Sequence, residues 1–137
     1  DKYEAGFKDN IDPYKENVVV IRDNAHSFEA VKRIKERRYC FAFSDDGHEY
    51  EDHVAELLTL LPVVHGVIAV DDVYLKDVRK AIRDCTDGLA GCDVQFLENC
   101  REAWIFNDPS QRQESSVPEE IVARLQGGLN DRRAGDS

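Results

Sequence analysis

Short apolar runs alternate with amphipathic segments along most of this chain. Residues 18–21, 39–43 and 67–70 are apolar at nearly every position, which is typical of strands that are buried on both faces. In the segments between and after these runs, apolar residues recur every three or four positions, as on one face of an α-helix. The helices expected from this spacing cover residues 28–34, 50–61 and 75–85.

The order of these elements predicts the topology of the sheet. A strand, a helix and a second strand imply a parallel pair with a right-handed crossover. Residues 93–97 and 103–106 are expected to form two more strands, and their link is short enough to require an antiparallel hairpin. We therefore expect an α/β fold: a Rossmann-like, mainly parallel sheet with helices on both faces and a C-terminal antiparallel hairpin.

The pattern also indicates how the chain is divided. Residues 1–17 are polar and weakly patterned, so no structure is assigned to them, and residues 18–108 form the expected α/β domain. Residues 109–137 are expected to form a linker, a short amphipathic helix and a disordered tail. Pro62 should end the helix before it, Ser27 should cap the helix after it, and Gly127-Gly128 should close the last helix.

Composition narrows the class of protein. The 137 residues are 42% hydrophobic, which suits one domain with a substantial core. The formal net charge of −10 argues against nucleic acid or an anionic membrane surface as partner. No apolar run is long enough to span a bilayer. The cysteines show no CxxC spacing, and we expect Cys40 and Cys85 to be buried, reduced thiols, which favours a cytoplasmic location.

Acidic residues follow two of the predicted strands directly. Asp45 comes after residues 39–43, and Asp71 and Asp72 come after residues 67–70. The carboxyl ends of neighbouring parallel strands share one edge of the sheet, where ligands bind in open α/β folds. Carboxylates gathered there repel one another unless a cation lies between them, and such hard oxygen ligands suit Mg²⁺. The alternative is that Asp45 and Asp72 cap the helices that follow, with His48 an exposed loop residue.

A basic cluster lies on the first predicted helix and just beyond it. It consists of Lys32, Arg33, Lys35, Arg37 and Arg38. These cations either form a phosphate site or make up a solvated face, in which case they lie favourably near the carboxyl end of the helix.

Three motifs resemble segments of class I S-adenosylmethionine-dependent methyltransferases, specifically the family of macrocin-type O-methyltransferases and cephalosporin-hydroxylase-like proteins. Residues 43–51, FSDDGHEYE, resemble the "DGDHSYEG" segment of that family. Residues 60–82, LLPVVHGVIAVDDVYLKDVRKAI, resemble "LLKPGGVIAFDDY…GVRKAV". Residues 18–27, VVVIRDNAHS, are similar to "VEVIxGDSxD". The resemblance covers about residues 18–108, the second half of such a fold.

The resemblance implies a function and a set of site residues. The chain would belong to an enzyme that transfers a methyl group from S-adenosylmethionine to a hydroxyl of a small-molecule substrate. Asp45, Asp71 and Asp72 would hold Mg²⁺, which lowers the pKa of the substrate hydroxyl. His48 would be the general base. Asn24, Ala25 and Asp45 would contact the cofactor, although Asn24 and Ala25 also fit an ordinary strand-to-helix turn.

The sequence departs from the family in one respect that leaves other functions open. It contains no glycine-rich GxGxG loop and no room for two further strands before Val18. The amino-terminal half would then come from another chain; a homo-oligomer is the other expected assembly. The chain would otherwise be a non-catalytic, methyltransferase-like interaction module. Residues 67–82 also resemble the first strand and acidic pair of a phosphorylation receiver, but the later strands are expected to form a hairpin, which a receiver does not have.

Overall fold

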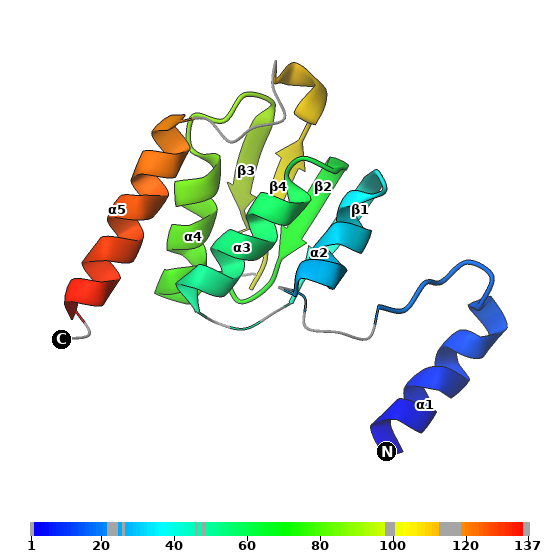
Figure 1. The fold of residues 1–137 in the computed structure, drawn as a ribbon. Helices are drawn as coiled ribbons and strands as arrows, with labels where there is room; N and C mark the ends of the chain where they lie inside the picture. The colour runs from blue at the N-terminus through cyan, green and yellow to red at the C-terminus, as the bar shows by residue number, and fades with distance from the viewer. Residues whose placement is uncertain are drawn as a thin grey trace.

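The fold centres on one mixed sheet, shown in Figure 1. The computed structural model describes residues 2–21, 25, 27–45, 47, 49–97, 101–112 and 119–135. The sheet has four strands in the order β1-β2-β4-β3. Their bounds are β1 (Tyr39–Ser44), β2 (Val64–Val70), β3 (Cys92–Phe96) and β4 (Ala103–Asn107).

The strand directions place the carboxyl ends of β1, β2 and β3 at one edge of the sheet. β1 pairs with β2 in parallel, which confirms the prediction for this pair. β4 is antiparallel to both β2 and β3, which confirms the hairpin. Because β4 lies between these two strands, β3 runs in the same direction as β1 and β2. The loops that follow β1, β2 and β3 therefore meet at the same edge.

The helices pack together on one side of the sheet (Figure 1). They are α2 (Phe28–Lys35), α3 (Tyr50–Leu60), α4 (Lys76–Thr86) and α5 (Glu119–Gly135), in which α3 contacts α2 and α4, and α5 contacts α4. Ser27 caps α2 as predicted, since its Oγ accepts the N–H of Ala30 at 3.1 Å. The core between helices and sheet includes the fully buried Leu57, Ile68, Ile82 and Ile105.

The opposite face of the sheet carries exposed aromatic side chains. Phe41 pairs with Val67 and Phe43 with Ala69 across the parallel pair, while Val67 and Ala69 in turn pair with Phe106 and Trp104. Paired residues lie on the same face. The four aromatic residues are 37% to 56% exposed, so no described helix covers them. The expectation of helices on both faces is therefore wrong for the described part of the chain.

The amino-terminal segment differs from the prediction. Residues 18–21 form no strand, and Val19 is 60% exposed. A strand needs a neighbour for its backbone N–H and C=O groups, and no described strand pairs with this apolar run. The weak pattern of residues 1–17 predicts no structure, but the chain forms α1 (Lys2–Ile11) and a short 3₁₀ turn, η1 (Asp12–Tyr14).

The last helix also differs, because it does not end at Gly127-Gly128. α5 continues to Gly135, although each glycine costs a helix about 1 kcal/mol relative to alanine. Ile121 and Leu125 are buried, and they hold α5 against the domain. A Cβ at Gly128 would lie 2.7 Å from the Tyr50 hydroxyl oxygen. The missing side chain therefore allows close packing, which offsets the low helix propensity.

The Asp84 carboxylate links α3 to α4, and Arg124 links α5 to the backbone at the end of α4. Asp84 Oδ2 on α4 accepts the hydroxyl of Tyr50, on α3, at 2.6 Å and the ammonium of Lys80 at 2.6 Å. Arg124 Nη1, on α5, donates to the carbonyl oxygens of Arg83, Asp84 and Asp87 at the end of α4. These bonds satisfy carbonyl groups that every helix end leaves without an intrahelical partner.

The prediction that Cys40 and Cys85 are both buried is confirmed only for Cys85. Cys85 is buried, but Cys40 is exposed, because β1 is an edge strand without a neighbour on its outer side. Burial, with the neighbouring Asp84 carboxylate, raises the pKa of the Cys85 thiol from 9.0 to about 12. Cys85 is therefore an inert, protonated core residue at neutral pH.

Replacing Cys85 with alanine should make the free energy of unfolding fall less steeply as the pH rises in the alkaline range. The folded state holds the thiol proton more tightly than the unfolded state. That contribution is full below pH 9.0 and is lost as the pH rises towards 12. The free energy of unfolding of the wild type should therefore approach that of Cys85→Ala as the pH rises from 9.0 towards about 12 in urea titrations. A difference that is independent of pH would contradict the burial of this thiol.

Candidate functional site

The carboxyl edge of the sheet brings together the three aspartates that the sequence singled out. Asp45, Asp71 and Asp72 each offer a carboxylate oxygen, and these oxygens lie within 4.8 Å of one another. The parallel ladder sets this arrangement, because the N–H of Asp71 donates to the carbonyl oxygen of Ser44 at 3.0 Å. The tips of β1 and β2 are thus held side by side. The structure confirms that the three residues converge; whether they hold an ion is a separate question.

Asp72 is fixed in an unusual backbone conformation. Its φ is +60°, in the left-handed region, which aspartate and asparagine tolerate better than most residues. Its carbonyl oxygen accepts the N–H of Leu75 at 3.0 Å, and the residue is only 6% exposed. The turn into α4 thus holds Asp72 in place, whereas Asp45 is exposed.

Neither Asp45 nor Asp72 occupies a helix N-cap. Glu49 is the N-cap of α3 and Leu75 is that of α4, and neither side chain makes a capping hydrogen bond. The alternative interpretation, in which these two aspartates exist to cap helices, is therefore wrong as stated. The cluster calls for another explanation.

Arg101 supplies a positive charge to the cluster. Its Nη2 donates to Asp72 Oδ1, and its Nε lies 3.9 Å from Asp71 Oδ1. The hydrogen bond to Asp72 is the main cause of a raised pKa of Arg101, followed by the charges of Asp72 and Asp71. The Arg101 carbonyl oxygen also accepts the N–H of Val73 at 2.9 Å. One guanidinium thus faces three carboxylates, and a further cation would still be attracted.

Arg101 could not be assigned to the site from the sequence. It lies in the turn between β3 and β4, and its position depends on β3 running parallel to β2. The available signal was the hairpin itself, since a turn at the carboxyl ends of the strands must lie near the acidic loops.

His53 anchors the loop that carries Asp45. Its ring is buried on α3, and Nε2 donates to the carbonyl oxygen of Gly47 at 2.5 Å. Nδ1 of His53 and Oγ of the buried Ser44, directly before Asp45, have no hydrogen-bond partner among the described residues. This role could not be predicted from the sequence, because His53 lies in the amphipathic pattern of α3 like any core residue.

The other predicted site residues do not extend the cluster. His48 and Asn24 lie outside the described residues. Ala25 is an exposed turn residue whose neighbours on both sides lie outside the described residues. A groove of about 530 Å³ lies along β1 instead, and its lining includes Val19, Ile21, Arg37, Phe41 and Phe43.

Comparison with other proteins adds no constraint. None of the helices in the described ranges has both the length and the apolar content to cross a membrane. No family model matches the chain, and neither the curated proteins nor the solved structures gave a match.

Proposed function

We propose that this chain is the cofactor-distal half of an S-adenosylmethionine-dependent O-methyltransferase that acts on a hydroxyl of a small molecule. In this proposal Asp45, Asp71 and Asp72 hold a divalent cation, Mg²⁺ in the first place. The observation that carries the proposal is the convergence of these three carboxylates at the carboxyl edge of β1 and β2. The sequence resemblance assigns the cation to the same three positions.

The spacing of the carboxylates fits a divalent cation. Two oxygens on one Ca²⁺ can be at most about 5.2 Å apart, and two on one Mg²⁺ about 4.2 Å. The separation of up to 4.8 Å therefore accommodates Ca²⁺ directly. It accommodates Mg²⁺ after a small movement of a side chain, and Asp45 is exposed and free to rotate towards the others.

The roles of the three carboxylates follow from their surroundings. Asp72 is buried and bound by Arg101, so it keeps its position whether or not a ligand is present. Asp71 is held by the ladder, and the exposed Asp45 leaves one side of the cluster open to a substrate. A cation bound here would lower the pKa of a substrate hydroxyl. His48 remains the predicted general base, three residues after Asp45.

The strand arrangement supports the same family. Parallel units followed by an antiparallel hairpin form the second half of a class I methyltransferase. Here β1, β2 and β3 share one direction and only β4 is reversed. This topology is compatible with the Rossmann-like fold that the resemblance implies.

S-adenosylmethionine does not fit the described residues by themselves. The 137 residues contain no glycine-rich loop, whose backbone N–H groups would bind the cofactor, and Ala25 lies exposed in a turn. We therefore propose that another chain, which carries the glycine-rich loop, completes the cofactor site.

Calorimetric titration tests both parts of the proposal. We expect Mg²⁺ or Ca²⁺ to bind the wild type, and Asp45→Asn to bind at least tenfold more weakly, because one of three anionic ligands is lost. Asp93→Asn, an exposed residue on β3, is the matched control. S-adenosylmethionine should give no measurable heat with this chain alone. Micromolar affinity for the cofactor would show that the missing half has been misjudged, and absent cation binding would refute the metal site.

One observation favours the second candidate, a non-catalytic interaction module. The face with Phe41, Phe43, Trp104 and Phe106 is exposed, and exposed aromatic clusters often mark binding surfaces. Under this alternative the acidic cluster would bind no cation, while the aromatic face would still bind a partner.

A further inference from the structure

We propose that a second copy of this chain pairs with β1 along its free edge, in an antiparallel and two-fold symmetric arrangement. The two sheets would then form one continuous sheet through the β1 strands. This inference goes beyond the proposed function and does not depend on it.

No described strand pairs with the backbone groups on the outer edge of β1. β1 is an edge strand in the sheet order. The carbonyl oxygen of Ser44 points towards β2, since it accepts the N–H of Asp71. Successive residues of a strand direct their N–H and C=O groups to opposite sides, so those of Phe43 point to the free edge. Such an edge is a template for a further strand.

The nearest segment of the same chain leaves this edge open. Val19 and Ile21 line the far side of the groove along β1, but residues 18–21 form no ladder with it. The groove runs along a strand, and its lining combines apolar side chains with the charged Arg33, Glu36 and Arg37. An extended polypeptide that carries both apolar and charged side chains suits such a groove.

Apolar side chains favour one register. Phe41 and Phe43 lie on the same face of β1 and are 56% and 51% exposed. In an antiparallel pair centred on Ala42, Phe41 of one copy lies opposite Phe43 of the other, and the two-fold axis repeats this pair. Aromatic residues directly opposite each other stabilise antiparallel strands. The bare faces of the two sheets would also join into one apolar surface.

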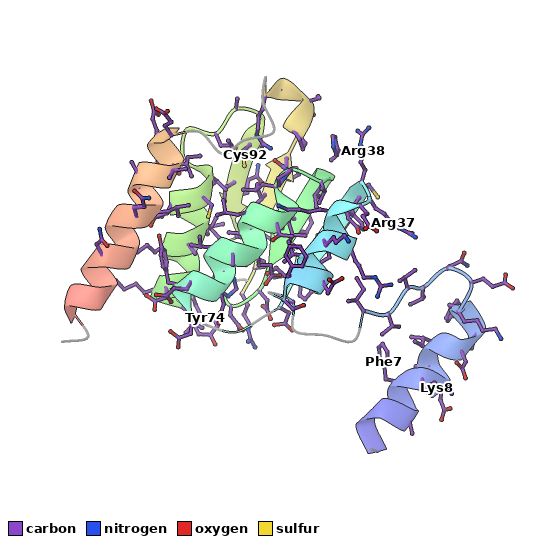
Figure 2. The ribbon with its side chains drawn as sticks, viewed as in Figure 1. Phe7, Lys8, Arg37, Arg38, Tyr74 and Cys92 are labelled. Atoms are coloured by element: carbon purple, nitrogen blue, oxygen red, sulfur yellow. The ribbon has the colours of Figure 1, made fainter. Side chains whose placement is uncertain are left out.

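The charges at the two ends of β1 favour a second copy as the partner. Arg37 and Arg38 directly precede the strand, and Asp45 directly follows it. Figure 2 shows the two arginines at the end of the sheet far from Tyr74, which lies near the acidic edge. The antiparallel register places Asp45 of one copy opposite Tyr39 of the other, next to Arg38, so that the long Arg38 side chain can contact Asp45, and this contact also occurs twice. A parallel pairing would bring like charges together.

The arginines are available for this contact. Arg37 makes no ion pair with any described residue, and Arg38 is exposed, with one contact from Nη2 to His65 Nδ1 at 3.0 Å. The net charge of −10 on each copy opposes association. At physiological ionic strength, salt screens the repulsion between charges more than about 8 Å apart. The proposed contacts between Arg38 and Asp45 are shorter, so salt weakens them less.

Sedimentation equilibrium of the full chain in EDTA tests the proposal. We expect a concentration-dependent mass that approaches twice the 15.6 kDa of one chain. Phe43→Lys should weaken the dimer at least tenfold, because it places like charges in the centre of the interface. Phe28→Lys is the matched control, since Phe28 is 78% exposed on α2, and it should leave the dissociation constant unchanged.

Charge reversal identifies the register. Arg38→Glu and Asp45→Lys should each weaken the dimer about tenfold, since each change occurs twice in the interface. The double variant should restore the wild-type dissociation constant, while Lys35→Glu, on the outer side of α2, should change it little. If the chain is a monomer at every concentration, the proposal is wrong, even if another molecule binds the free edge of β1. A dimer that Phe43→Lys leaves intact, or that the double variant does not restore, overturns it as well.

Discussion

Substitution of Gly66 by alanine is expected to destabilise the domain by about 3 kcal/mol or more. The register of the parallel pair shifts between Tyr39 and Phe41. Tyr39 pairs with Val64 and Phe41 with Val67, so the irregularity lies opposite residues 65 and 66 of β2. At this irregularity the backbone of Cys40 approaches Gly66 closely. A Cβ at position 66 would lie 2.0 Å from the Cys40 carbonyl oxygen and 3.0 Å from its carbonyl carbon. Both atoms belong to the backbone, so the strands themselves would have to separate.

Urea denaturation of Gly66→Ala measures this effect, with Gly127→Ala as the control. Gly127 lies inside α5 and has no atom within 4 Å of an added Cβ, so alanine there should be neutral or stabilise by up to about 1 kcal/mol. If Gly66→Ala were as stable as the wild type, the register of β1 on β2 would be wrong. The alignment of Asp45 with Asp71 would then lose its structural basis.

Divalent cations are expected to stabilise the folded chain, and Asp71→Asn should abolish that effect. Binding to the native state alone adds about 2.7 kcal/mol when the free cation is at 100 times its dissociation constant. For a domain of this size that is roughly a 10 °C rise in the melting temperature. Without a cation, the variant should be slightly more stable than the wild type, by at most about 1 kcal/mol, because a like charge has been removed.

Asp71 is the best position for this change. Asparagine has the same shape, and the main tie of Asp71 to the fold is its backbone N–H, which remains. Asp72 is less suitable, because its replacement would also remove the hydrogen bond from Arg101. Asp93→Asn serves as control, since it removes one negative charge from an exposed strand position. An equal response to the cation in Asp71→Asn and wild type would place the binding site elsewhere.

Much of the sheet and the acidic cluster could be predicted because local patterns determine them. The apolar runs of β1 and β2, with a helix between them, left one plausible pairing, and the rule for parallel strands then placed Asp45 beside Asp71 and Asp72. The hairpin followed from the short link between β3 and β4. In each case the inference needed only neighbouring segments of the chain.

The features that were missed depend on contacts between distant segments. An apolar run such as residues 18–21 indicates a strand only if a partner strand is present, and its own sequence cannot show that. Phe41 and Phe43 were assumed to be buried for the same reason, although one face of the sheet is bare. The path of α5 through Gly128 depends on Tyr50, and the position of Arg101 depends on the order of β3 and β4.

Thermal unfolding of the wild-type chain in Mg²⁺ or Ca²⁺ and in EDTA tests the central claim most directly, namely that Asp45, Asp71 and Asp72 form a cation site. The oxygens of these residues lie within 4.8 Å of one another, and their mutual repulsion is only partly offset by Arg101. We predict a melting temperature that rises with cation concentration and falls back when EDTA is added. The same melting temperature in both buffers would contradict the metal site.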